Sequence, residues 1–89
     1  MNTLDLVRGL TLRQLQIFEV AARNLSFARA AEQLHLTQPA ISMQIKLLED
    51  AIGTALFERV GKKVQLTEAG NRLVHHASRI LGELKDAAA

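Results

Sequence analysis

The stretch SFARAAEQLHLTQPAISMQIKLLEDAIG, residues 26–53, decides the fold because it holds two helical patterns separated by a very short gap. Ser26 can accept a hydrogen bond from the first turn of one helix, and Thr37 can do the same for the next. Pro39 fits inside the first turn of that second helix, where its missing N–H costs nothing. Only residues 35–37 separate the two patterns, too few for a comfortable antiparallel pair. The spacing therefore predicts a helix-turn-helix, whose two helices cross at a steep angle.

The second of these helices, predicted from Thr37 to Ile52, has two faces of different character. Its apolar residues recur every three or four positions, so they gather on one side and should face the core. No carboxylate occurs between Thr37 and Leu48, so DNA phosphates could approach the opposite side without repulsion. An ordinary solvated face would more often mix Glu with Lys, as happens here only from Glu49 onward. We therefore predict a recognition helix with these candidate DNA contacts: Gln38, Pro39, Ala40, Ser42, Met43, Gln44 and Lys46.

The chain around this stretch favours a small, mainly α-helical domain. Its 89 residues allow one core, and with 48% hydrophobic but only 3% aromatic residues that core must consist of Leu, Ile, Val and Ala. Thr11 and Gln14 have the spacing of a capping box, which predicts a further helix from Leu12 to Asn24. Three helices can then enclose the core.

After Gly53, which can end the recognition helix, the pattern changes to two short strands. Residues Leu56–Val60 and Lys63–Leu66 are joined through Gly61 and Lys62, as expected for a two-stranded wing. The fold class is therefore a winged helix-turn-helix. Arg59, Lys62 and Lys63 lie at the wing tip, where they could grip phosphates or enter the minor groove.

Phosphate contacts are also predicted at the two helix starts, where Ser26 and Thr37 combine hydroxyls with free backbone N–H groups, and Arg29 could assist. Within the recognition helix, Gln38 is expected to hydrogen-bond base edges. Gln44 falls on the flank between the core and the exposed side, so it could face either the core or the DNA.

A fourth helix is predicted from Thr67 to the end of the chain. Its apolar stripe is too wide for an isolated helix, and at about 30 Å a helix of roughly 20 residues should project beyond so small a body. We expect residues 1–66 to form the DNA-binding domain and residues 67–89 a dimerisation helix. The candidate residues for contact with a second copy are Leu73, Val74, Ala77, Ile80, Leu81 and Leu84.

Nothing in the sequence favours an enzyme, a bound cofactor or a metal site. The chain has no cysteine, which excludes disulfides and fits the cytoplasm, and no run approaches the length of a membrane span. His35 lies in the turn, where a residue that tolerates positive φ is needed, and has no partner ligand. His75 and His76 are adjacent and so point about 100° apart on a helix, which is poor geometry for one metal.

The segments LRQLQIFEVAA, SFARAAEQLHLTQPAIS, QIKLLE, LFER and LTEAG, in this order between Leu12 and Gly70, resemble the N-terminal domain of LysR-type transcriptional regulators. More narrowly, TLRQLQIF, HLTQPAISMQIK and HHASRILGE resemble the subgroup that regulates Calvin-cycle carbon-fixation operons. Met43 departs from the common pattern, in which Arg follows the Ser of this helix, although the subgroup also favours Met there.

The resemblance implies a bacterial regulator that works on the nucleoid in the cytoplasm. It also implies dimers with antiparallel linker helices, full-length tetramers, and target sites in promoter DNA that are interrupted palindromes. A small-molecule effector would bind a C-terminal module that this chain lacks, so we expect the chain to be a piece of a longer protein. The alternative function is a protein-interaction module without sequence-specific DNA binding, because a winged helix alone does not define its partner.

Overall fold

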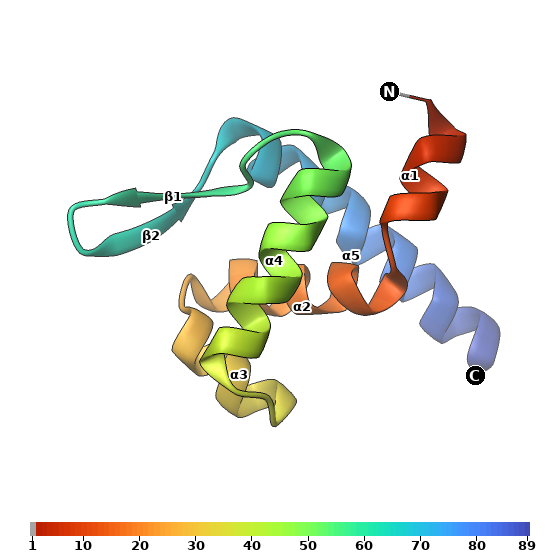
Figure 1. Cartoon of the computed structure of the whole chain (residues 1–89). Helices are drawn as coiled ribbons and strands as arrows, with labels where there is room; N and C mark the ends of the chain where they lie inside the picture. Colours follow the sequence, from red (N-terminus) through yellow and green to blue (C-terminus); the bar gives the residue numbers. More distant parts are fainter. Residues whose placement is uncertain (1) are drawn as a thin grey trace.

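The computed structural model describes residues 2–89 and shows a helical body from which one β-ribbon extends (Figure 1). Helix α4 crosses in front of α2, and α5 runs behind them towards the C-terminus (Figure 1). The strands pair antiparallel, with Phe57 opposite Leu66 and Val60 opposite Lys63. In chain order the elements are α1 (Thr3–Gly9), α2 (Leu12–Asn24), α3 (Phe27–Leu34), α4 (Gln38–Ile52), β1 (Phe57–Val60), β2 (Lys63–Leu66) and α5 (Glu68–Ala88).

Side-chain caps begin the four helices that the sequence predicts. The Thr11 hydroxyl accepts from the Gln14 N–H at 3.0 Å while the Gln14 side chain accepts from the Thr11 N–H at 3.1 Å, so the predicted capping box is confirmed. The hydroxyls of Ser26, Thr37 and Thr67 each accept from the N–H three residues further on. These caps explain why the observed helix starts lie where the sequence places them.

Left-handed backbone conformations end α2, α3 and α4. His35 ends α3 with φ 56°, which confirms the prediction of positive φ in the turn. Gly53 ends α4 with φ 90°, and Leu25 ends α2 with φ 48°, a position that the sequence did not mark. The sharp turns at residues 25 and 35 hold α3 between its two neighbours.

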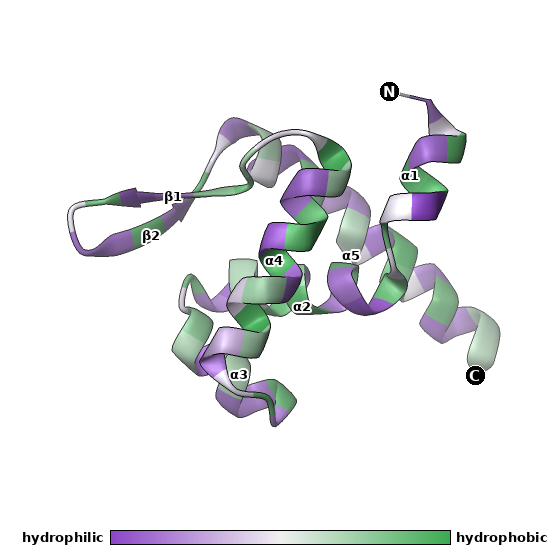
Figure 2. Ribbon diagram, viewed as in Figure 1, coloured by the Kyte–Doolittle hydropathy of each residue, from purple (hydrophilic) through white to green (hydrophobic). Residues whose placement is uncertain are grey.

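The core lies where α2, α3, α4 and the start of α5 meet. Phe18, Ile41, Leu48 and Ala30 are fully buried, and Ile17 and Ile45 are nearly so. Figure 2 shows how apolar residues alternate with polar ones along each helix, as expected for helices with one face in a core. The apolar side predicted for α4 is therefore the buried side.

Residues 2–89 form five helices rather than the predicted four, because residues Thr3–Gly9 form α1. The Asn2 side chain caps this helix by accepting from the Asp5 N–H at 2.9 Å. Helix α1 packs against the C-terminal end of α4, where a Cβ added to Gly9 would lie 3.1 Å from the Ala51 Cβ. No residue of α1 is buried, which is why this short helix has no clear apolar periodicity.

The wing and α5 follow the predicted order, with one shifted boundary. Strand β1 begins at Phe57 rather than Leu56: the pairing with β2 starts with Phe57 opposite Leu66, while Leu56 is fully buried in the core. Helix α5 packs against α2, and its C-terminal end extends past the body in Figure 1. Among residues 2–89, no helix combines the length and the apolar character needed to cross a membrane.

Candidate nucleic-acid interface

The outer face of α4 is open to solvent for most of its length. Gln38, Pro39, Ser42 and Lys46 are exposed, and 63% of Met43 is exposed, whereas Ala40 is half-buried. Because Ile41, Ile45 and Leu48 of the same helix are at most 3% exposed, α4 divides into a core face and a free face. The free face is the surface that the sequence predicts for contact with DNA.

Lys46, on the free face of α4, forms an ion pair with Asp50. Its Nζ lies 2.9 Å from an Asp50 carboxylate oxygen in an exposed ion pair one helical turn away. The hydrogen bond that Lys46 donates to Asp50, together with the negative charge of Asp50, raises the pKa of Lys46 above its ordinary value. Lys46 therefore stays charged at neutral pH, and a phosphate would have to compete with Asp50 for it.

Gln44 lies on the flank of α4, half-buried and turned towards α2. Its side-chain oxygen accepts from the Gln14 Nε2 at 3.4 Å. Gln14 is 7% exposed and also belongs to the capping box of α2. Gln44 is therefore committed in part to a contact between helices, which the sequence left open.

A hollow between the wing and the starts of α3 and α4 gathers residues that are far apart in the sequence. It brings the Ser26 cap and Gln38 together with Arg59, Lys62 and Lys63 of the wing, five of the predicted DNA contacts. No acidic residue lines this hollow. Its lining residues are Leu25, Ser26, Phe27, Ala28, Gln38, Arg59, Lys62, Lys63, Val64 and Gln65.

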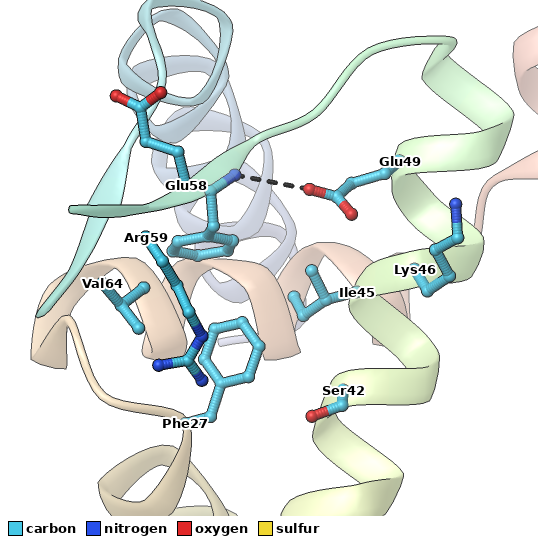
Figure 3. Close-up of a pocket in the computed structure, with 9 residues that line it drawn as sticks. Phe27, Ser42, Ile45, Lys46, Glu49, Glu58, Arg59 and Val64 are labelled. Carbon is cyan, nitrogen blue, oxygen red and sulfur yellow. Dashed lines mark hydrogen bonds between the residues drawn. The ribbon is translucent and has the colours of Figure 1, made fainter. Parts of the chain in front are cut away.

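A second hollow lies between the wing and the middle of α4 (Figure 3). Ser42 and Lys46 line it from α4, and Arg59 extends across it towards Phe27. Unlike the first hollow, this one has acidic residues in its lining, Glu49 and Glu58, although the Glu58 carboxylate points away from Glu49 in Figure 3. Arg59 lines both hollows and so connects them.

Aromatic contacts fix the base of the wing to the helices. The Phe57 ring meets Phe18 edge-on, with centroids 5.6 Å apart, and meets Phe27 edge-on at 5.1 Å. The sequence did not predict this cluster, because its three rings come from β1, α2 and α3 and share no local pattern. The cluster places the cations of the wing beside α3 and α4.

Glu49 anchors the wing from the side of α4, and the sequence did not single it out. One of its carboxylate oxygens accepts from the backbone N–H of Leu56 at 2.7 Å and from that of Phe57 at 3.3 Å, the second of which is drawn in Figure 3. Its backbone carbonyl accepts from Gly53 and Thr54 at the end of the helix. This residue therefore organises the whole connection between α4 and β1.

Thr67 and Gly70 hold the other side of the wing base. The Thr67 hydroxyl donates to the Ala55 carbonyl at 2.7 Å, and the Thr67 N–H donates to the Leu56 carbonyl at 3.0 Å. Gly70 is buried so close to this segment that an added Cβ would lie 2.1 Å from the Leu56 oxygen. The start of α5 thus clamps the segment that leads into the wing.

Two predicted phosphate contacts lie outside both hollows. Arg29 is exposed on α3, and Thr37 is exposed at the start of α4 with its hydroxyl oxygen engaged by the Ala40 N–H. A hydroxyl that accepts in this way still has its hydrogen to donate. Both residues therefore stay accessible at the edge of the surface.

The stripe predicted for dimerisation divides along α5. Ala77 is fully buried in the chain's own core, and Leu73 and Val74 pack against that core, so Ala77 has no surface left for a partner. Ile80 and Leu84 are 45% and 49% exposed, and Leu81 is half-buried.

His75 and His76 are exposed on the same helix, and residues 2–89 contain no group of three His, Cys, Asp or Glu side chains arranged to hold a metal ion.

Three helices around one core, the pair α3 and α4 joined by a turn of only three residues, and a two-stranded ribbon beside α4 define a winged helix-turn-helix domain. Residues 12–71 match the family described as bacterial regulatory helix-turn-helix proteins of the lysR family. The chain belongs to this family, which agrees with the resemblance seen in the sequence.

Similar curated proteins carry the names of transcriptional regulators, some of them of the RuBisCO operon. The chain is 69% identical over 81 residues to the HTH-type transcriptional regulator CfxR of Cupriavidus necator, covering 91% of this chain and 26% of the relative. It is 62% identical over 73 residues to the RuBisCO operon transcriptional regulator of Allochromatium vinosum, covering 82% and 24%. The chain thus spans about a quarter of the length of these relatives.

Similar solved structures include complexes with DNA. A BenM_DBD complex with catB site 1 DNA superposes with a TM-score of 0.85 and 32% identity, covering 89% of this chain and 88% of that chain. A CbnR_DBD–DNA complex gives a TM-score of 0.83 and 35% identity, covering 89% and 91%. These likenesses confirm the predicted fold class.

Proposed function

We propose that this chain is the sequence-specific DNA-binding part of a bacterial transcriptional regulator. The observation that supports this most strongly is the acid-free hollow in which Ser26 and Gln38 meet three wing cations. A surface of this kind attracts phosphates and offers them both hydroxyl and cationic donors. The lysR-family membership and the DNA complexes of similar domains support the same function.

In this proposal α4 enters the major groove with its N-terminal turns foremost. Gln38 hydrogen-bonds base edges, while Pro39 and Ala40 contact thymine methyl groups. Ser42 and Met43 lie along the same face, and Lys46 contributes a phosphate contact when it leaves Asp50. Gln44 acts mainly by holding α4 against α2 through Gln14, with a lesser role towards DNA.

The rest of the surface fixes the protein on the DNA backbone. Ser26, Arg29 and Thr37 bind phosphates on either side of the major groove. Arg59, Lys62 and Lys63 reach the adjacent backbone or the minor groove. These contacts carry no sequence information and set the salt dependence of binding.

Two similar regulators are named for the RuBisCO operon, which supports a carbon-fixation operon as the target. The working protein would be a cytoplasmic, nucleoid-associated dimer paired through α5, assembled into tetramers when a C-terminal effector module is attached. Its promoter sites would be interrupted palindromes whose half-sites lie near multiples of one helical turn apart.

Replacing Gln38 by alanine tests the assignment of base contacts. The change should weaken the free energy of binding to a carbon-fixation promoter fragment from the native genome by about 1–3 kcal/mol, but leave binding to mixed-sequence duplex almost unchanged. Fluorescence anisotropy on both duplexes measures this difference. Gln16→Ala, an exposed glutamine on α2, is the matched control and should change neither affinity. Equal losses on both duplexes would refute base reading by Gln38, and a wild-type chain that binds neither duplex at low salt would favour the protein-interaction module instead.

The proposed dimer depends on the exposed part of the α5 stripe. Ile80→Glu combined with Leu84→Glu should convert a dimer into monomers, because two charges would enter an apolar contact. Sedimentation equilibrium measures the change. Leu4→Glu with Val7→Glu, two apolar residues on α1 that are even more exposed, is the control and should leave the dimer intact. A mass that is the same for all three proteins would argue against pairing through α5.

A further inference from the structure

We propose that Glu49 is a positioning residue for the wing, which it holds at a fixed angle to α4 through two backbone N–H groups. The inference rests on the proposed DNA binding and assigns a function to a residue that would itself touch no DNA. It explains how the cations of the wing reach phosphates at the same time as α4 reaches the bases.

The first argument is the placement of the two hydrogen bonds. Leu56 and Phe57 are the residues at which the chain enters β1, and both donate to the same Glu49 oxygen. Glu49 itself lies near the C-terminal end of α4. A single side chain therefore connects the recognition helix directly to the start of the wing, and charge-assisted bonds of this type are stronger than neutral ones.

The second argument is that the negative charge of Glu49 would by itself weaken DNA binding at this place. Glu49 lines the hollow that also contains Ser42, Lys46 and Arg59, so its carboxylate would repel a phosphate approaching that surface. A residue whose only effect was on the electrostatics of DNA binding would be better neutral. Its two hydrogen bonds to β1 supply the compensating role.

The third argument is that a small change at this point moves the wing tip. Strand β1 runs from Phe57 to Val60, and the turn after it carries Lys62. A small rotation of the backbone at residues 56–57 would therefore produce a larger displacement of the cations at the wing tip. Thr67 and the Phe57 ring hold the segment from other sides, so loss of Glu49 should loosen the wing without unfolding it.

Glu58 provides a matched control. It follows Phe57 in β1 and carries the same charge as Glu49, but its side chain makes no hydrogen bond or ion pair with any part of the chain that the structure describes and points away from Glu49 in Figure 3. Glu58→Ala should slightly raise the affinity for mixed-sequence duplex, by about twofold, because a repulsive charge is lost. Glu49→Ala removes the same charge and should instead lower the affinity roughly tenfold, because the charged hydrogen bonds are lost.

A double-mutant cycle separates wing positioning from a general loss of stability. When Lys62→Ala and Lys63→Ala are already present, Glu49→Ala should cost less than about twofold, since little of the wing contact is left to misplace. Losses that simply multiply, or a Glu49→Ala chain that binds duplex as tightly as wild type, would overturn the proposal. If circular dichroism shows that the Glu49→Ala chain is unfolded, Glu49→Gln and Glu58→Gln replace the two alanine variants. Their affinities for duplex should change in the same directions by smaller factors.

Amide hydrogen exchange of the 89-residue chain gives a readout that needs no DNA. The Leu56 and Phe57 amides should exchange at least about tenfold faster in Glu49→Ala and at the wild-type rate in Glu58→Ala. Unchanged exchange in both variants would overturn the anchoring role. A wild-type chain that binds no duplex would refute the DNA-binding proposal separately, and the exchange rates would still decide whether Glu49 holds β1.

Discussion

Gly70→Ala should lower the free energy of unfolding by roughly 3 kcal/mol, because the new methyl group would overlap a backbone atom. The added Cβ would lie 2.1 Å from the Leu56 oxygen and 2.9 Å from the Leu66 Cδ2. The leucine side chain could move, but the oxygen belongs to the segment that Thr67 and Glu49 hold in place. Denaturant unfolding followed by circular dichroism measures the loss.

Gly82→Ala in the same helix is the control for that substitution. No atom lies within 4 Å of its added Cβ, and alanine favours a helix by about 0.5–1 kcal/mol over glycine. This variant should therefore be more stable than wild type. Two glycine variants that shifted stability in the same direction would contradict the close approach of α5 to Leu56.

Removing the three wing cations together should have the largest effect on function. The combination Arg59→Ala, Lys62→Ala and Lys63→Ala should weaken binding to every duplex by about two to three orders of magnitude near 0.1 M salt, and should lower the salt slope by about three. The loss follows because each phosphate contact releases roughly one counterion. Titrations of promoter and mixed-sequence duplexes over a range of salt concentrations measure both quantities.

A second triple variant distinguishes the wing from net charge. Arg8→Ala, Arg23→Ala and Arg72→Ala lie on α1, α2 and α5 and line neither hollow, yet they also change the net charge from +2 to −1. Their effect on affinity should be much smaller, because screening limits the reach of charges away from the contact surface. Comparable losses in the two triple variants would mean that the wing has no special role.

The helix-turn-helix could be predicted because its determinants are local. Thr37 and Pro39 mark the start of α4, and Gly53 marks its end. The apolar residues of α4 repeat every three or four positions, a pattern that can be recognised without knowing what the helix packs against. His35 could be predicted for the same reason, since one residue must bear the positive φ of the turn. The family resemblance includes this segment and extends from Leu12 to Gly70.

The parts that the sequence did not predict depend on contacts between elements. Gln44 faces Gln14 from 30 positions away, and Glu49 reaches β1 only because the chain reverses after Gly53. Ala77 belongs to an apolar stripe that looks continuous along α5, and only the packing of the body decides where burial ends. Helix α1 lacks a buried face and so leaves no periodic signal.

The cluster of Phe18, Phe27 and Phe57 has a practical consequence, because the chain contains no other phenylalanine and no tyrosine or tryptophan. Every phenyl proton signal in an NMR spectrum therefore originates at one junction between ribbon and helices. Rings in edge-on contact shift one another's resonances, so a few well-separated lines would report on the base of the ribbon during a titration without any isotopic or fluorescent label.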